Sequence, residues 1–266
     1  MLRRWPTFLA ALILLVAACA QDDSATTAIA DSSTTQSAEP TTTIDQEVAT
    51  TASAVTIMHI GGGLTQGGGD HSTYRCFLDT LLHDAGVVFD FVGSRQKPAD
   101  GYDYTCPTDF DQDHEAWAGA QVGGLETEMM TASVEALQPD VALVHLGGFD
   151  VWKRGEPLVT AGRLELFITG LQAVSPDITL LIAQMIPCVT PLPWCTEDYP
   201  ALSDAIASFG SLSTDESTVM AIDMHTGVST DLLRPDNLSF TDAGDEVLAS
   251  RWMDALEESG VITASS

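Results

Sequence analysis

The glycine-rich stretch 61–69 is the first place where this sequence could hold a ligand, because backbone N–H groups without side chains around them can cradle a phosphate. Phosphate-binding loops end in Gly-Lys-Ser/Thr or place G-x-G-x-x-G at the start of a helix, and this stretch has neither context. We therefore interpret it as a segment in which no side chain enters a pocket.

Three alternating acidic residues, Asp109, Asp111 and Asp113, imitate the start of a calcium-binding loop. Such a loop also needs a glycine at its sixth position and a glutamate at its twelfth, where this chain has His114 and Ala120. The pattern predicts an exposed acidic loop, and we expect neither a metal site nor a cofactor.

The elements that must position these residues follow from apolar runs that alternate with amphipathic segments. Such alternation predicts a parallel sheet covered by helices on both faces, a three-layer α/β/α domain with five strands. The expected strands are 55–60, 87–92, 140–146, 178–183 and 219–223, and the expected helices are 72–85, 122–137, 160–174, 201–212 and 241–260. Because ligands bind beyond the carboxyl ends of parallel strands, the segments that follow these strands are the candidates for the site.

The amino terminus has the features of an export signal, residues 1–18. Arg3 and Arg4 precede an apolar stretch, 8–18, that is shorter than the 20 or so residues of a membrane-spanning helix. It closes with Ala17-Ala18-Cys19, which is similar to a bacterial lipobox, and Cys19 is therefore the expected site of lipidation. The alternative is an ordinary cleaved signal peptide, so the protein is expected on the outer side of a bacterial cell membrane or secreted.

Residues 19–54 are rich in Ser and Thr and contain no aromatic residue and no Lys or Arg, which is typical of a disordered tether. The folded domain is expected over 55–266. Four cysteines lie in it, and an even number in an exported chain indicates disulfides with three possible pairings. Cys188 and Cys195 are close enough to close a local loop, which leaves Cys76 to pair with Cys106.

The charge balance limits the partners. With 10 Lys and Arg against 38 Asp and Glu, the formal net charge is −28, which repels nucleic-acid phosphates and anionic headgroups. We expect no nucleic acid, a membrane contact only through the lipid at Cys19, and a monomer.

Seven segments, most of them at or near the predicted strand ends, resemble sequence stretches of the SGNH (GDSL) hydrolases and occur in the same order. The first, Ile57–Gly67, is similar to I-M-x-L-G-D-S-I-T-Q-G, and the second, Asp113–Gly119, to D-H-E-G-H-x-G. His145–Asp150 is similar to H-L-G-T-N-D, and Pro235–Gly244 to P-D-G-V-H-P-N-x-x-G. Weaker matches lie at Ser72–Arg75 with Phe89–Ser94, and at Ile182–Pro187. The resemblance implies a flavodoxin-like SGNH hydrolase fold and an esterase or carbohydrate deacetylase ancestry.

The resemblance also implies where the catalytic groups belong, and most of them are substituted. The nucleophilic serine falls on Gly63 and the aspartate before it on Gly62. The asparagine of the oxyanion hole falls on Phe149 and the base histidine on Ser239, whereas Gly119 and Asp236 are retained. A glycine cannot form an acyl-enzyme and a serine cannot act as a base near neutral pH, so the family's hydrolysis is expected to be lost.

Other residues near these positions could take over the lost catalytic roles. Thr65 is expected to point into the helix that follows the first strand, His59 to be a core histidine, and His145, which the family also shows, to be structural. His114, beside Glu115, could face the cleft and activate a water, although no activated nucleophile accompanies it.

Aromatic residues lie close in sequence to the former catalytic positions and suggest what the cleft could hold. They suit the apolar face of a sugar ring or an acyl chain, but they could equally fill the volume of the lost side chains. With Gly63, Thr65, His114, Gly119, Asp150, Asp236 and Ser239, the predicted cleft residues include Trp117, Phe149, Trp152 and Phe240.

Three functions from different classes remain. The protein is predicted to be a tethered, non-catalytic binder of a glycan or a small acyl ester. The alternatives are an active esterase or carbohydrate deacetylase with relocated catalytic residues, and a structural module of the cell envelope with a vestigial cleft.

Overall fold

The structure is a computed structural model that describes residues 53–68, 72–106, 109–188, 192–234 and 239–263. Cys19 and Asp236 lie outside these ranges, as do the predicted signal and nearly all of the predicted tether. The strands are β1 Val55–Gly61, β2 Phe89–Val92, β3 Glu115–Ala116, β4 Val141–His145, β5 Thr179–Ala183 and β6 Val219–Ile222. The α-helices are α1 Gly63–Gln66, α2 Tyr74–Asp84, α3 Leu125–Leu137, α4 Gly148–Trp152, α5 Pro157–Val174, α6 Tyr199–Ile206 and α7 Asp242–Glu258. Single π or 3₁₀ turns occupy Trp194–Asp198, Phe209–Leu212 and Thr230–Leu232.

The sheet is parallel throughout, in the order β2-β1-β4-β5-β6, and the short β3 pairs with the end of β1. The direction in which strands are added changes between β1 and β4. The chain places β2 on one side of β1, and it then places β4, β5 and β6 in turn on the other side. Such a reversal leaves a crevice beyond the carboxyl ends of the two strands.

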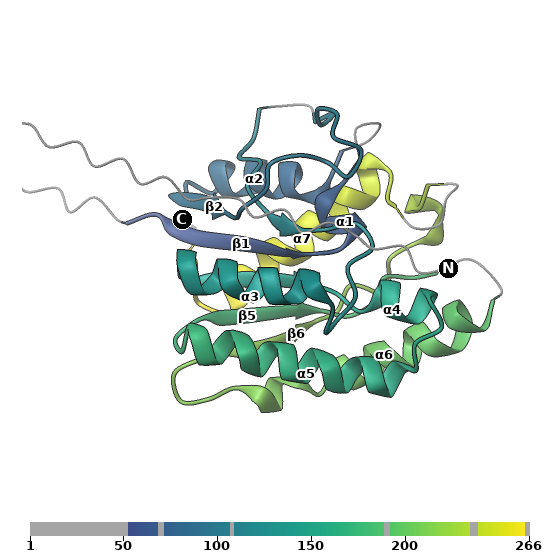
Figure 1. The fold of residues 1–266 in the computed structure, drawn as a ribbon. Coiled ribbons are helices and arrows are strands. Elements are labelled where there is room, and N and C mark those ends of the chain that lie inside the picture. Colours follow the sequence, from purple (N-terminus) through teal and green to yellow (C-terminus); the bar gives the residue numbers. More distant parts are fainter. Residues whose placement is uncertain (1–52, 69–71, 107–108, 189–191, 235–238, 264–266) are drawn as a thin grey trace, which may run out of the picture. The chain divides into compact units, whose positions relative to one another are not determined.

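Alternate residues of each strand enter two separate cores. Met58, Ala142 and Leu180 pack with α3, α5 and α6, whereas Ile57, Leu143 and Leu181 pack with α2 and α7. Figure 1 shows these helices as two layers on opposite faces of the sheet. The strands are covered on both sides, which explains their nearly continuous apolar sequences and confirms the predicted three-layer class.

Three short elements were absent from the sequence prediction: α1, β3 and α4. Each has five residues or fewer, too few to show a hydrophobic period. The predicted helix 201–212 is divided, since α6 ends at Ile206 and a 3₁₀ turn follows. The prediction of five strands holds for the main path of the sheet.

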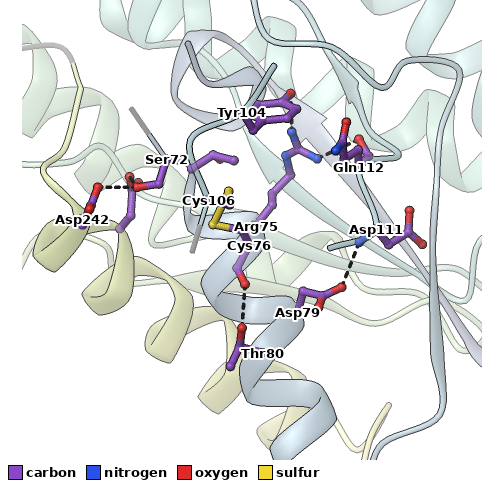
Figure 2. Close-up of a disulfide and its surroundings, with 12 residues drawn as sticks. Ser72, Arg75, Cys76, Asp79, Thr80, Tyr104, Cys106, Asp111, Gln112 and Asp242 are labelled. Atoms are coloured by element: carbon purple, nitrogen blue, oxygen red, sulfur yellow. Dashed lines mark hydrogen bonds between the residues drawn. A yellow bond between two sulfur atoms is a disulfide. The ribbon is translucent and has the colours of Figure 1, made fainter. Parts of the chain in front are cut away.

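Both predicted disulfides are present, Cys76–Cys106 and Cys188–Cys195. The first joins α2 to the long loop that follows β2. Figure 2 shows it beside Arg75, whose side chain reaches from α2 towards Tyr104 and Gln112 on the same loop.

The buried Arg75 fixes this loop to the start of the fold. Its Nε donates to the carbonyl of Thr65 at 2.9 Å, and its guanidinium donates to the carbonyl of Gln112 at 3.0 Å and to the hydroxyl of Tyr104 at 2.6 Å. Arg75 is fully buried, and burial lowers its pKa. One side chain thus holds the loop against α1.

The prediction of an exposed acidic loop is only partly right. Asp109 is exposed, but Asp111 and Asp113 are half-buried. The carboxylate of Asp111 accepts from the backbone N–H groups of Phe91 at 2.9 Å and Asp113 at 3.1 Å, and Asp79 accepts from the N–H of Asp111. These carboxylates therefore order the loop beside β2.

The junction of α2 and α7 contains a buried carboxyl that makes stability depend on pH. Asp245 is 4% exposed, and burial raises its pKa to about 8, although the hydroxyl of Ser72 donates to it at 3.3 Å. Because an unfolded aspartate ionises near pH 4, the folded protein holds more protons than the unfolded chain between about pH 4 and 8. This group therefore lowers stability as the pH rises through that window.

Asp245→Asn is expected to become progressively more stable than the natural protein from pH 5 to 8, by on the order of 1 kcal/mol per pH unit. The free energy of urea unfolding, measured at four pH values, checks this. Asp254→Asn, at an exposed position of the same helix, is the matched control and should follow the natural protein. A difference that stays constant with pH would show that Asp245 is ionised in the fold.

No helix in the described ranges is long and apolar enough to cross a membrane.

Candidate functional site

A cavity of about 380 Å³ lies beyond the carboxyl ends of β1, β4 and β5, where the strand order reverses. The segment after β1, the second-block loop, the turn into α4 and the start of α6 all reach it. Its lining residues are Gly62, Gly63, Leu64, Gly67, Gly68, Ala99, Ala118, Gly119, Ala120, His145, Leu146, Gly147, Gly148, Phe149, Trp152, Met185, Ile186, Tyr199 and Ser239.

The two positions that align with the missing aspartate and serine open onto this cavity. A Cβ atom at Gly62 would meet nothing within 4 Å, and one at Gly63 would meet only the Cβ of Ala118, at 3.9 Å. The backbone therefore leaves room for side chains at both positions. Both residues are glycines, and their surroundings do not crowd them.

The ring of Phe149 lies directly in front of Gly119. A Cβ atom at Gly119 would lie 3.5 Å from Cζ of the Phe149 ring, and Gly119 has a φ of +85°, which favours glycine. Phe149 stacks on Trp152 with ring centroids 5.3 Å apart and an interplanar angle of 29°. A phenyl ring has no hydrogen-bond donor, so the Phe149 side chain makes this part of the cavity apolar.

Ser239 also lines the cavity, at 8% exposure. The carbonyl of Ser239 accepts from the N–H of Arg234 at 2.8 Å. The sequence-predicted partner Asp236 falls outside the described residues. Of the predicted cleft residues, the structure brings Gly63, Gly119, Phe149, Trp152 and Ser239 together, beside Gly62, which the resemblance aligns with the lost aspartate.

Five other predicted cleft residues lie outside the lining. Thr65 is fully buried over Gly61, Asp150 accepts the N–H of Val122 on both carboxylate oxygens, and Phe240 packs into the core against Gly244. Trp117 is half-buried and lies beneath the guanidinium of Arg95, at 4.8 Å.

His114 is the fifth, and its hydrogen bonds oppose a role as a relocated base. It is fully buried, its Nδ1 accepts from the N–H of Ala116 at 3.1 Å, and its Nε2 donates to the carbonyl of Lys97 at 3.2 Å. Burial lowers its pKa to about 3. Both ring nitrogens are therefore engaged in holding the second-block loop, away from the cavity.

Sequence reasoning missed part of the cavity wall. Tyr199, at the start of α6, donates to the carbonyl of Gly148 at 3.1 Å, and Met185 and Ile186 follow β5. Ala99 comes from the loop that Arg75 and Cys76–Cys106 hold. Only the position of Met185 and Ile186 after a predicted strand could have indicated them in advance.

The described lining carries no charge near pH 7. Its two titratable side chains are His145 and Tyr199; burial lowers the pKa of His145 to about 4 and raises that of Tyr199 to about 12. Lys153 is not part of the lining, but its Nζ lies over the rings of Phe149 and Trp152, 5.3 and 4.7 Å from their centroids. The cavity is therefore mainly apolar and neutral, with backbone groups and a few hydroxyls as its polar parts.

No group of three or more potential metal ligands occurs within the described ranges.

Comparison with known proteins separates fold from sequence. No family model matches the chain, and no curated protein matches it either. Solved structures do: a family 3 carbohydrate esterase from Talaromyces cellulolyticus superimposes with a TM-score of 0.67 and 23% identity, over 79% of this chain and 100% of that chain. This chain has the SGNH hydrolase fold.

Two further SGNH-fold structures agree. A mutant acetyl esterase with an acetate ion gives a TM-score of 0.67 at 24% identity, over 77% of this chain and 97% of that chain. The family 3 carbohydrate esterase of Clostridium thermocellum gives 0.62 at 22% identity, over 77% and 98%. These likenesses establish the architecture, and the function has to be argued from the cavity itself.

Proposed function

We propose that this protein binds a small neutral ligand, a glycan or an acyl ester, in the cavity at the ends of β1 and β4 and leaves it unhydrolysed. The observation that carries the proposal is the cavity beyond the carboxyl ends of the strands. Gly63 lines it at the position expected for the nucleophile, and the ring of Phe149 faces Gly119. A ligand site needs the cavity, whereas hydrolysis also needs the missing side chains.

Trp152 supports binding through its position at the rim. It is 38% exposed, stacked on Phe149, and lines the cavity, so part of its indole surface can contact a sugar ring or an acyl group. The names of the similar structures, two carbohydrate esterases and an acetyl esterase, make sugars and their acetyl esters the first probes to test.

Trp152→Ala is expected to weaken binding of methyl 6-O-acetyl-β-D-glucopyranoside by about 5- to 10-fold, since an aromatic contact is worth about 1 kcal/mol. Ligand-detected NMR titration measures it. Leu158→Ala, at an exposed position of α5, is the control and should bind like the natural protein. Equal affinity of both variants would remove the cavity rim from the site, and release of acetate by the natural protein would favour a relocated active site instead.

We further propose that the protein is exported and held at the membrane by lipid on Cys19, with 20–54 as a tether. Support comes from the lipobox-like end of the amino-terminal signal. Cys19→Ser is expected to move the protein from the membrane fraction to the medium of expressing bacteria. Unchanged membrane association of that variant, measured by immunoblot, would contradict the lipid anchor.

A further inference from the structure

Among the described residues, His145 lines the cavity with a polar ring from the end of the central strand β4, and one of its ring nitrogens lacks a partner. It is 7% exposed and is the last residue of β4, where it pairs with Gly61 of β1. Its Nδ1 is buried and has no hydrogen-bond partner among the described residues, so Nε2 is the ring nitrogen that a ligand would have to meet.

The other buried histidines differ. Both ring nitrogens of His114 are occupied. His59 lies in the core, edge-on to Phe91 with ring centroids 4.4 Å apart and with Nδ1 3.4 Å from the hydroxyl of Tyr74. Its Nε2 also lacks a partner, but His59 does not line the cavity. An unpaired buried nitrogen costs about 1–3 kcal/mol. His145 carries this cost at the wall of the ligand cavity.

The chemistry of the ring defines what can pair with it. Burial lowers the pKa of His145 to about 4, so the imidazole is neutral at pH 7 with one N–H donor and one acceptor nitrogen. A hydroxyl group matches it, since it can donate to the one or accept from the other. A carboxylate or phosphate would find no cation on the described lining, in a chain of net charge −28.

We propose that His145 is the specificity-determining residue of the cavity and hydrogen-bonds a hydroxyl of the ligand, which is therefore a neutral hydroxyl-bearing compound with an apolar face, such as a sugar. This inference rests on the proposed binding function and names its ligand class. The apolar face lies against Phe149 and Trp152, and the hydroxyl points to the end of β4. The sequence predicts a structural role for His145, whereas its place on the cavity wall supports a role in holding the ligand.

Two variants separate these roles without reference to activity. His145→Leu removes both ring nitrogens, whereas His145→Gln keeps a donor and an acceptor. If His145 serves the ligand, His145→Leu has an unfolding free energy equal to or above that of the natural protein, because it removes an unpaired polar group. A clear loss of stability in His145→Leu would overturn the inference in favour of a structural role.

Binding is then measured by NMR titration with methyl β-D-glucopyranoside, with acetate and inorganic phosphate as the anionic probes. We expect the sugar to bind in preference to the anions, His145→Leu to weaken it at least about tenfold, and His145→Gln to recover part of the loss. Loss of binding in Trp152→Ala with none in His145→Leu would overturn the inference and leave the proposed function standing. Tighter binding of either anion would overturn it as well, and a natural protein that binds neither this sugar nor its acetyl ester would overturn both.

Discussion

Four substitutions are expected to turn this chain into an ester hydrolase: Gly62→Asp, Gly63→Ser, Phe149→Asn and Ser239→His. The first two positions have room for side chains, as the open space around their Cβ sites shows. Ser239 lines the same cavity, and removing the Phe149 ring clears the front of Gly119. A nucleophile, a base and a polar oxyanion donor would then meet at one cavity, with Asp236 still in the sequence three residues before the new histidine.

The restored protein should hydrolyse 4-nitrophenyl acetate at least about 10²-fold faster than the natural chain, since a single oxyanion donor alone contributes about 10²–10³-fold. The matched control carries Gly63→Ala in place of Gly63→Ser and keeps the other three substitutions. It should remain at the level of the natural protein, because it has the pocket and the base but no nucleophile. Equal rates for the restored protein and this control would mean that the cavity does not align with the SGNH active site.

The second large effect concerns stability. Arg75→Met is expected to lower the free energy of unfolding by about 3 kcal/mol or more, because three acceptors, on Thr65, Tyr104 and Gln112, lose their donor inside the protein. The methionine fills much of the volume but offers no N–H. Urea unfolding, followed by tryptophan fluorescence, gives the change.

Arg163→Met is the control for this measurement. Arg163 is exposed on α5, so its replacement should change the unfolding free energy by less than about 0.5 kcal/mol. Comparable stability of the two variants would show that the loop after β2 is held by Cys76–Cys106 without help from Arg75.

The sequence was sufficient for the architecture because long periodic segments carry most of it. Apolar runs such as 140–146, bounded by turn residues, are typical of strands covered on both faces, and helices such as α2 show a clear amphipathic period. The short α4 has no such period, and its start depends on Gly147, whose φ of +99° turns the chain after β4.

The lining of the cavity could be predicted where a residue belongs to a sequence motif. The prediction failed where packing decides in which direction a side chain points. Gly62, Gly63, Gly119, Phe149 and Ser239 follow from the block resemblance. His114 has a suitable residue type in a suitable block, yet its orientation is set by Ala116 N–H and Lys97 C=O, which no local pattern encodes. Tyr199 reaches the cavity from α6, about 50 residues along the chain from its partner Gly148.

The measurement that tests the central claim most directly is a single NMR sample of the natural protein with an excess of methyl 6-O-acetyl-β-D-glucopyranoside. Saturation transfer from the protein reports binding, and the acetate methyl signal reports hydrolysis in the same tube. We predict saturation transfer from the natural protein to the ligand, and weaker transfer from Trp152→Ala. Acetate should form no faster than in a tube without protein. Acetate that accumulates in proportion to the protein concentration would contradict the account, because it would require a nucleophile elsewhere in the cavity.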